Sequence, residues 1–200
     1  MKEVAPKQEQ PITPEEFFAK MQILRVSKEQ FFDLVKARYP EKTDEEILLK
    51  QGICFTRGGK TTALIRTDCF PEKYLSYIET HEKWEGYVSQ KEGYNLINKS
   101  VHQYRKDKGP DAFSDSEKLL NEVNNYNYSF GHEYAIYKEY EQAMKDGKLD
   151  EYHKWLMNFR EQRKLSIDQK FYKVIENDTK IRESIYKKLK EGTKHSFLKS

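Results

Sequence analysis

Apolar positions recur at helical spacing through the first quarter of the chain, and polar residues mark where the helices begin. Thr13 is a typical N-cap, with proline next and two glutamates in the first turn. Ser27 and Thr43 each open a capping-box pattern, completed three residues later by glutamine or glutamate. These starts predict a helix from Thr13 to about Ile23 and helices over residues 28–38 and 44–51, which Pro40 and Gly52 end.

The pattern then changes to one typical of strands. Residues 53–56 and 61–66 are rich in β-branched and aromatic side chains, and Gly58 and Gly59 lie between them. A pair of glycines supplies the positive φ angles that a tight hairpin turn needs. We therefore expect one antiparallel β-hairpin near residues 53–66, as the only sheet, supported by helices because a lone hairpin is marginally stable.

Helical spacing resumes after Pro71 and continues almost to the C-terminus. A helix is expected from there to about Gln90, although Gly86 inside it costs roughly 1 kcal/mol relative to alanine. Further helices are expected at about 94–107, 115–125, 130–146, 149–164, 168–176 and 179–191. The predicted fold class is mainly α, on the margin of α+β, with a flexible leader (1–12), a single helical domain (13–191) and a frayed tail (192–200).

Composition supports a folded core and argues against a membrane protein. Hydrophobic residues make up only 36% of the chain, but aromatic residues reach 14%, and each buried ring removes roughly 150–250 Å² from water. No apolar run approaches the roughly 20 residues that span a bilayer, and the first ten residues lack a signal-peptide core. A cytoplasmic protein is expected, with Cys54 and Cys69 as free thiols.

Two of the expected helices carry histidine and glutamate at positions that can converge. In the helix after Pro71, His81 and Glu85 are four residues apart and therefore neighbours on the helix surface. Glu82 shares a broad face with Glu85. In the helix over 130–146, His132 and Glu139 follow the same helical face.

If these helices pack together, His81, Glu85 and His132 supply three ligands for zinc or another divalent metal, with a fourth position open, as in catalytic zinc sites. Glu139 is then either a fourth ligand or a carboxylate that orients an imidazole. Glu82 is placed to deprotonate a water molecule, so a metal-dependent hydrolase is one reading of the pattern.

The stretch His81-Glu82-Lys83-Trp84-Glu85 resembles the His-Glu-x-x-His helix of the zincin metallopeptidases, which lies beneath a sheet. The strand-like segment 61–66 precedes it at a suitable distance. The resemblance implies that Glu82 is the general base. The chain departs from the motif at Glu85, where the family has its second histidine.

Two other readings remain open on the sequence alone, and whether the protein is an enzyme is left undecided. His81 can simply hydrogen-bond Glu85 or a tyrosine at the surface of the domain. Residues 154–200 hold 13 Lys and Arg against 6 Asp and Glu, so this part carries +7 while the remainder carries −4. That asymmetry suits a non-enzymatic helical adaptor or a nucleic-acid-associated protein that uses its basic C-terminal region.

Overall fold

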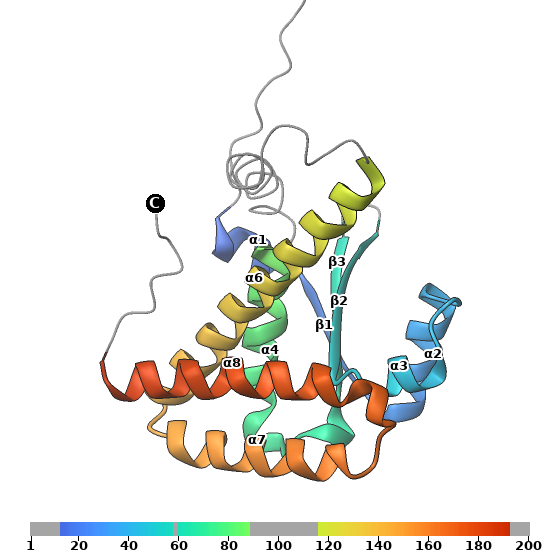
Figure 1. The fold of residues 1–200 in the computed structure, drawn as a ribbon. Coiled ribbons are helices and arrows are strands. Elements are labelled where there is room, and N and C mark those ends of the chain that lie inside the picture. Colours follow the sequence, from blue (N-terminus) through green and yellow to red (C-terminus); the bar gives the residue numbers. More distant parts are fainter. Residues whose placement is uncertain (1–12, 58–59, 89–115, 193–200) are drawn as a thin grey trace, which may run out of the picture.

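The computed structural model describes residues 13–57, 60–88 and 116–192, and Figure 1 shows their arrangement. The elements that the site depends on are three strands and a set of helices. In chain order they are α1 (Pro14–Lys20), β1 (Gln22–Val26), α2 (Lys28–Arg38), α3 (Asp44–Leu48), β2 (Gly52–Arg57), β3 (Lys60–Arg66), α4 (Glu72–Tyr87), α6 (Ser116–Lys145), α7 (Leu149–Lys164) and α8 (Tyr172–Lys190).

The three strands form a sheet in the order β1-β3-β2. β2 runs antiparallel to β3, and β1 runs parallel to β3 with Leu24 opposite Leu64. Successive side chains of a strand point to opposite faces. Accordingly Leu64 packs with Phe31, Val35 and Ile47 of α2 and α3, whereas Ile65 packs with the larger helical core on the other face.

The larger core lies between α4, α6, α7 and α8. It is rich in aromatic side chains, and Tyr74, Tyr77, Tyr140 and Tyr152 are almost completely buried there. α4 packs against both β2 and β3 and also runs beside α6 (Figure 1). This position makes α4 the link between the sheet and the helices, and it carries most of the residues of interest below.

The expected fold class, mainly helical with a small sheet, is confirmed. The helices predicted over 28–38 and 149–164 have those bounds in the structure, and the antiparallel hairpin is present as β2 and β3. The sheet has one strand more than the expected hairpin, because residues 22–26 form a third strand. Its partner β3 is distant in sequence, so local spacing placed these residues at the end of a helix, which instead ends at Lys20.

Two predicted helix breaks are absent. The helices expected at 115–125 and 130–146 are one continuous helix, α6, and those expected at 168–176 and 179–191 are largely one helix, α8. Asparagines and Gly131 lower the helix propensity of α6, and packing against α4 outweighs that local effect.

Some predictions fall on parts of the chain outside these ranges. They are the leader 1–12, the turn at 58–59, the helix at 94–107 and nearly all of the tail 192–200. Both cysteines are free thiols. Within the described ranges, no helix is long and apolar enough to cross a membrane.

A close contact between α4 and β2 explains why Gly86, which weakened the prediction of this helix, lies within it. A Cβ atom at Gly86 would lie 2.7 Å from Sγ of Cys54 on β2. Real Cβ atoms do not approach sulfur that closely, so the missing side chain lets α4 lie close against the strand. The close contact brings the end of α4 near the start of β2, where the candidate site is found.

The replacement Gly86→Ala tests this contact. We expect it to lower the free energy of unfolding by about 1–3 kcal/mol, as overpacking does, although alanine favours a helix. The measurement is urea unfolding followed by circular dichroism. The double variant Gly86→Ala/Cys54→Ala removes the opposing sulfur and should recover most of the loss; equal stability of Gly86→Ala and the unaltered protein would contradict the packing explanation.

Candidate metal centre

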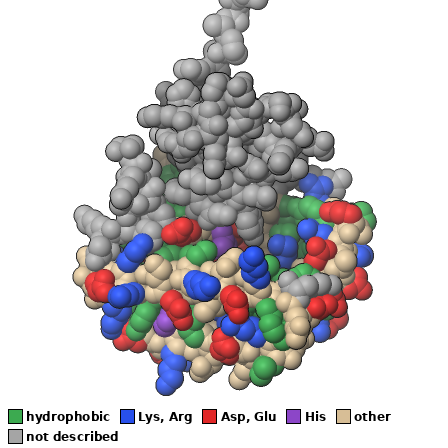
Figure 2. Space-filling view, in the orientation of Figure 1, with side chains coloured by type: hydrophobic (Ala, Val, Ile, Leu, Met, Phe, Trp, Pro, Cys, Tyr) green, Lys and Arg blue, Asp and Glu red, His purple; other side chains and the backbone are tan. Residues whose placement is uncertain are grey.

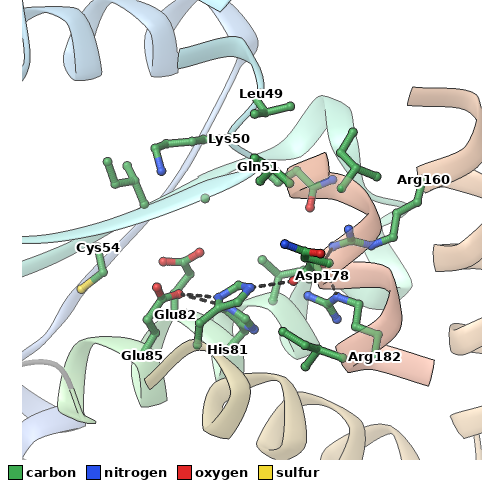
Figure 3. Close-up of a pocket in the computed structure, with 18 of the residues that line it drawn as sticks. Leu49, Lys50, Gln51, Cys54, His81, Glu82, Glu85, Arg160, Asp178 and Arg182 are labelled. Carbon is green, nitrogen blue, oxygen red and sulfur yellow. Dashed lines mark hydrogen bonds and ion pairs between the residues drawn. The ribbon is translucent and has the colours of Figure 1, made fainter. Parts of the chain in front are cut away.

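The side-by-side packing of α4 and α6 brings His132 of α6 to His81 and Glu85 of α4, and Figure 3 shows the two α4 residues side by side. One ligand atom from each of the three lies within 4.8 Å of the other two. Nε2 of His81 is 3.0 Å from Oε2 of Glu85, and Nδ1 of His132 is 3.5 Å from the same oxygen. The two rings lie edge to face with their centroids 4.9 Å apart.

Each imidazole is anchored by a second carboxylate at its other nitrogen. Nδ1 of His81 lies 2.9 Å from Oε2 of Glu139, and Nε2 of His132 lies 2.7 Å from Oδ1 of Asp178. Such carboxylates fix the orientation and the tautomer of histidines that bind metals. They leave Nε2 of His81 and Nδ1 of His132 directed at Glu85.

The anchoring carboxylates belong to a buried network of charges. Glu139, which is completely buried, accepts hydrogen bonds from Arg182 at 2.7 Å and from the hydroxyl of Tyr152. Asp178 binds Arg182 at 3.1 Å and also pairs with Arg160. The network joins α6, α7 and α8 to the histidine of α4.

Burial and these partners act on the pKa values in opposite directions. Burial lowers the pKa of His81, but the hydrogen bonds to Glu139 and Glu85 outweigh it and raise that pKa to about 10. Burial likewise opposes the charged form of Glu85, yet its contacts with His132 and His81 hold the pKa of its carboxyl well below the usual range. Without a metal, the group is therefore held together as imidazolium and carboxylate ions.

Glu82 lies beside this group in a different environment. Its side chain is buried, and Oε2 has no hydrogen-bond partner among the described residues. Burial, followed by repulsion from Glu85, raises the pKa of Glu82 to about 8. Gly52 makes room for it, because a Cβ atom there would lie 2.2 Å from Oε1 of Glu82. A buried carboxyl with an unused oxygen is a common feature of catalytic acids and bases.

A cavity of about 650 Å³ lies over these residues. Glu82 and Glu85 line it from α4, Lys50 and Gln51 from the segment between α3 and β2, and Asp178 from α8, as Figure 3 shows. This volume is within the range of small-molecule sites, roughly 300–1,000 Å³. The candidate ligands therefore adjoin a space that can hold a substrate.

The donor set fits a divalent metal. Two imidazole nitrogens and a carboxylate oxygen form a ligand set of catalytic zinc sites, where ligand bonds are near 2.0–2.2 Å. Tetrahedral ligands at that distance are about 3.4 Å apart. The two contacts of Glu85 with the histidines already match this spacing, at 3.0 and 3.5 Å. The residues thus form a group that could hold a metal, with no single metal favoured by the geometry alone.

All five residues singled out in the sequence lie together. His81, Glu85 and His132 form the group itself, and Glu82 adjoins it. Glu139 lies behind His81, in the orienting position, rather than beside Glu85 as a further ligand.

Sequence reasoning missed three contributors: Asp178, Arg182 and Gly52. Asp178 and Arg182 were counted only among the charges of the basic C-terminal region. They lie instead on the apolar face of α8, at helical spacing from Ile175, Ile185 and Leu189, which are all buried. Charged residues inside an apolar stripe were the signal that was available. Nothing in the sequence marks Gly52 as a neighbour of Glu82.

The sequence also allowed His81 simply to form a hydrogen bond with Glu85 at the surface of the domain. The structure agrees with this interpretation in the hydrogen bond but not in the position of the ring. Its hydrogen bond to Glu85 is present, but the ring is buried and lies between two carboxylates rather than at the surface. Burial of a charged group is costly unless it is fully paired. This favours a specialised role for the residue.

Part of the positive charge of the basic C-terminal region is paired with carboxylates in the described residues. Arg182 is turned inward, and Lys190 pairs with Asp150 at 2.9 Å. Figure 2 shows Lys and Arg side chains interspersed with Asp and Glu over the visible surface. The reading as a nucleic-acid-binding surface on residues 154–200 therefore gains no support from this arrangement.

Comparison with known proteins gives no family for the chain: no protein-family model, no curated protein and no solved structure matches it.

The replacement Glu139→Gln tests the network behind His81. Loss of this buried charge leaves Arg182 with Asp178 as its only carboxylate and His81 with Glu85 alone, so we expect the free energy of unfolding to fall by about 3–5 kcal/mol. Urea unfolding measures the effect. Glu141→Gln on the same helix is the matched control, because Glu141 pairs with Lys138 and Lys145 near the surface and should cost at most about 1 kcal/mol. Similar losses in both variants would refute the special importance of the buried pair.

Proposed function

We propose that the protein is a metal-dependent hydrolase, with His81, Glu85 and His132 as ligands of zinc or another divalent metal. The observation that carries the proposal is the convergence of these three ligand atoms beside a buried carboxylate and a cavity. A divalent metal in such a site lowers the pKa of bound water toward about 7 and polarises the bond to be cleaved.

Glu82 is the proposed general base. Its carboxylate lines the cavity next to the proposed ligands, and its oxygen Oε2 has no protein partner within the described part of the chain. In the ionised form of Glu82, that oxygen can accept a proton from water and later return it to the leaving group. Gly52 supports this role by leaving space for the carboxylate.

Glu139 and Asp178 are proposed as positioning residues. Each accepts a hydrogen bond from the nitrogen that the histidine does not offer to the metal. Arg182 contacts both carboxylates and so fixes their relative positions. Residues of this kind typically change metal affinity about 10–100-fold when they are replaced.

A zinc titration tests the ligand assignment. The metal-free protein should bind one equivalent of Zn²⁺ in competition with a chromogenic chelator, and His132→Gln should weaken binding by more than about tenfold. His153→Gln is the control, because His153 contacts Tyr140 and Tyr186 and does not face the cavity. Zinc affinity that is the same in His132→Gln and the unaltered protein would exclude His132 as a ligand.

The replacement Glu82→Gln tests the reaction. Zinc affinity should stay within about threefold of the original, while hydrolysis should slow by about 10²–10⁴-fold, as loss of a general base does. The assay uses 4-nitrophenyl substrates with carboxylic ester, amide, phosphate monoester and phosphate diester bonds. Glu79→Gln, on the same helix and paired with Arg25, is the control.

Two results would count against a hydrolase. One is that the unaltered protein hydrolyses none of the four substrates faster than the His132→Gln variant does. The other is an unchanged rate in Glu82→Gln, which would remove Glu82 from the reaction even if the metal is bound.

A further inference from the structure

The cavity over the proposed metal site has a surplus of cationic side chains. Arg160 and Arg163 line it from α7, Arg182 from α8 and Lys50 from the segment between α3 and β2. Arg182 is balanced by its two carboxylates, Glu139 and Asp178. Arg160 shares Asp178 with Arg182, whereas Arg163 and Lys50 have no carboxylate within ion-pair distance among the described residues.

Arg160 is buried, at 8% exposure, with an unused donor. Its ion-pair partner is Asp178, and the same carboxylate also serves Arg182 and His132. The Nε–H group of Arg160 is buried and has no acceptor among the described residues. An unsatisfied buried donor costs about 1–3 kcal/mol, so a structure that keeps one at a cavity is suited to a bound acceptor.

Arg163 lies one helical turn beyond Arg160 on α7. It donates to the backbone carbonyls of Leu48 and Leu49, at 3.0 and 2.8 Å, which hold the guanidinium in place without neutralising its charge. In the part of the chain that the structure describes, no carboxylate lies within ion-pair distance of it. Arginine stays charged at neutral pH even where burial lowers its pKa, as it does here.

Lys50 follows Leu49 directly and is drawn on the cavity wall opposite Glu82 in Figure 3. No described carboxylate pairs with its ammonium group. Lys50 and Arg163 are thus linked through the same short segment, since Arg163 binds the carbonyl of the residue before Lys50.

We propose that the cavity binds a small phosphate-bearing molecule, whose negative charge is recognised by the lining cations Arg160, Arg163 and Lys50. This proposal rests on the proposed hydrolase function and names its substrate class. Guanidinium groups match the oxygens of phosphate in pairs. A phosphate dianion has enough charge and oxygens for three cationic partners, whereas a carboxylate has fewer. The cavity volume of about 650 Å³ suits a small molecule rather than a polymer.

Calorimetric titration of the metal-free protein with inorganic phosphate at low salt tests the proposal. Omitting the metal ensures that phosphate bound directly to zinc does not contribute. We expect one phosphate per chain, and binding about tenfold weaker or more in Arg163→Gln and in Lys50→Gln, because each loses one charged contact. Lys154→Gln is the matched control: this exposed lysine lies on α7 and does not line the cavity.

Lys50→Gln keeps the test decisive if Arg163→Gln fails to fold, because the Lys50 side chain has no hydrogen-bond or ion-pair partner within the described ranges. Circular dichroism checks both variants. Absence of phosphate binding overturns the proposal, as does an equal loss in Lys154→Gln. Acetate bound as tightly as phosphate would overturn the choice of phosphate.

A parallel zinc titration separates this proposal from the proposed function. Normal zinc binding without phosphate binding would reject the substrate class and leave the metal site standing. Phosphate binding without zinc binding would reject the metal site and leave an anion-binding cavity, which no longer supports a hydrolase. Zinc affinity that is unchanged in Lys50→Gln, together with weaker phosphate binding, is the result expected if both are correct.

Discussion

The ion pair between Glu139 and Arg182 is the interaction on which the rest of the site depends. Glu139 is fully buried on α6, and Arg182 is buried on α8. Through Glu139 the pair fixes one nitrogen of His81, and through Asp178 it fixes one nitrogen of His132. Removing two charges from water costs several kcal/mol each, and only complete pairing offsets that cost. The positions of four helices are therefore tied to the geometry of one cluster.

An apolar core of the same volume would often be as stable as such a cluster or more stable. The aromatic core beside it shows that the fold has ample apolar packing available: Tyr74, Tyr77 and Tyr152 are buried within the same bundle. Buried charges here do not substitute for a missing core. Their arrangement is better explained by what they position, namely two imidazole nitrogens and a carboxylate beside a cavity, and this is why we favour a chemical role over a purely structural one.

Sequence patterns predicted the elements that depend on neighbouring residues. They missed the elements and contacts whose partners lie far along the chain. Capping boxes at Ser27 and Thr43 and helical spacing around His81 and His132 identified the helices and the converging residues, because each depends on neighbours within one or two turns. The strand at 22–26 and the contacts of Asp178 depend on segments far along the chain. Gly86 was interpreted only as a weak point of its helix, since its use, close approach to Cys54, exists only in three dimensions.

The charge of the site explains how one network can suit both a metal-free and a metal-bound state. In the metal-free protein, contacts with carboxylates raise the pKa values of His81 and His132 and favour protonation of both rings. The two protons that face Glu85 lie where a divalent ion would bind. A divalent cation in their place would bring positive charge to the same position, so Glu139, Asp178 and Arg182 can keep their pairing. A divalent cation bound there would compete with those protons for the same nitrogen atoms, while Glu139 and Asp178 hold the opposite nitrogen of each ring.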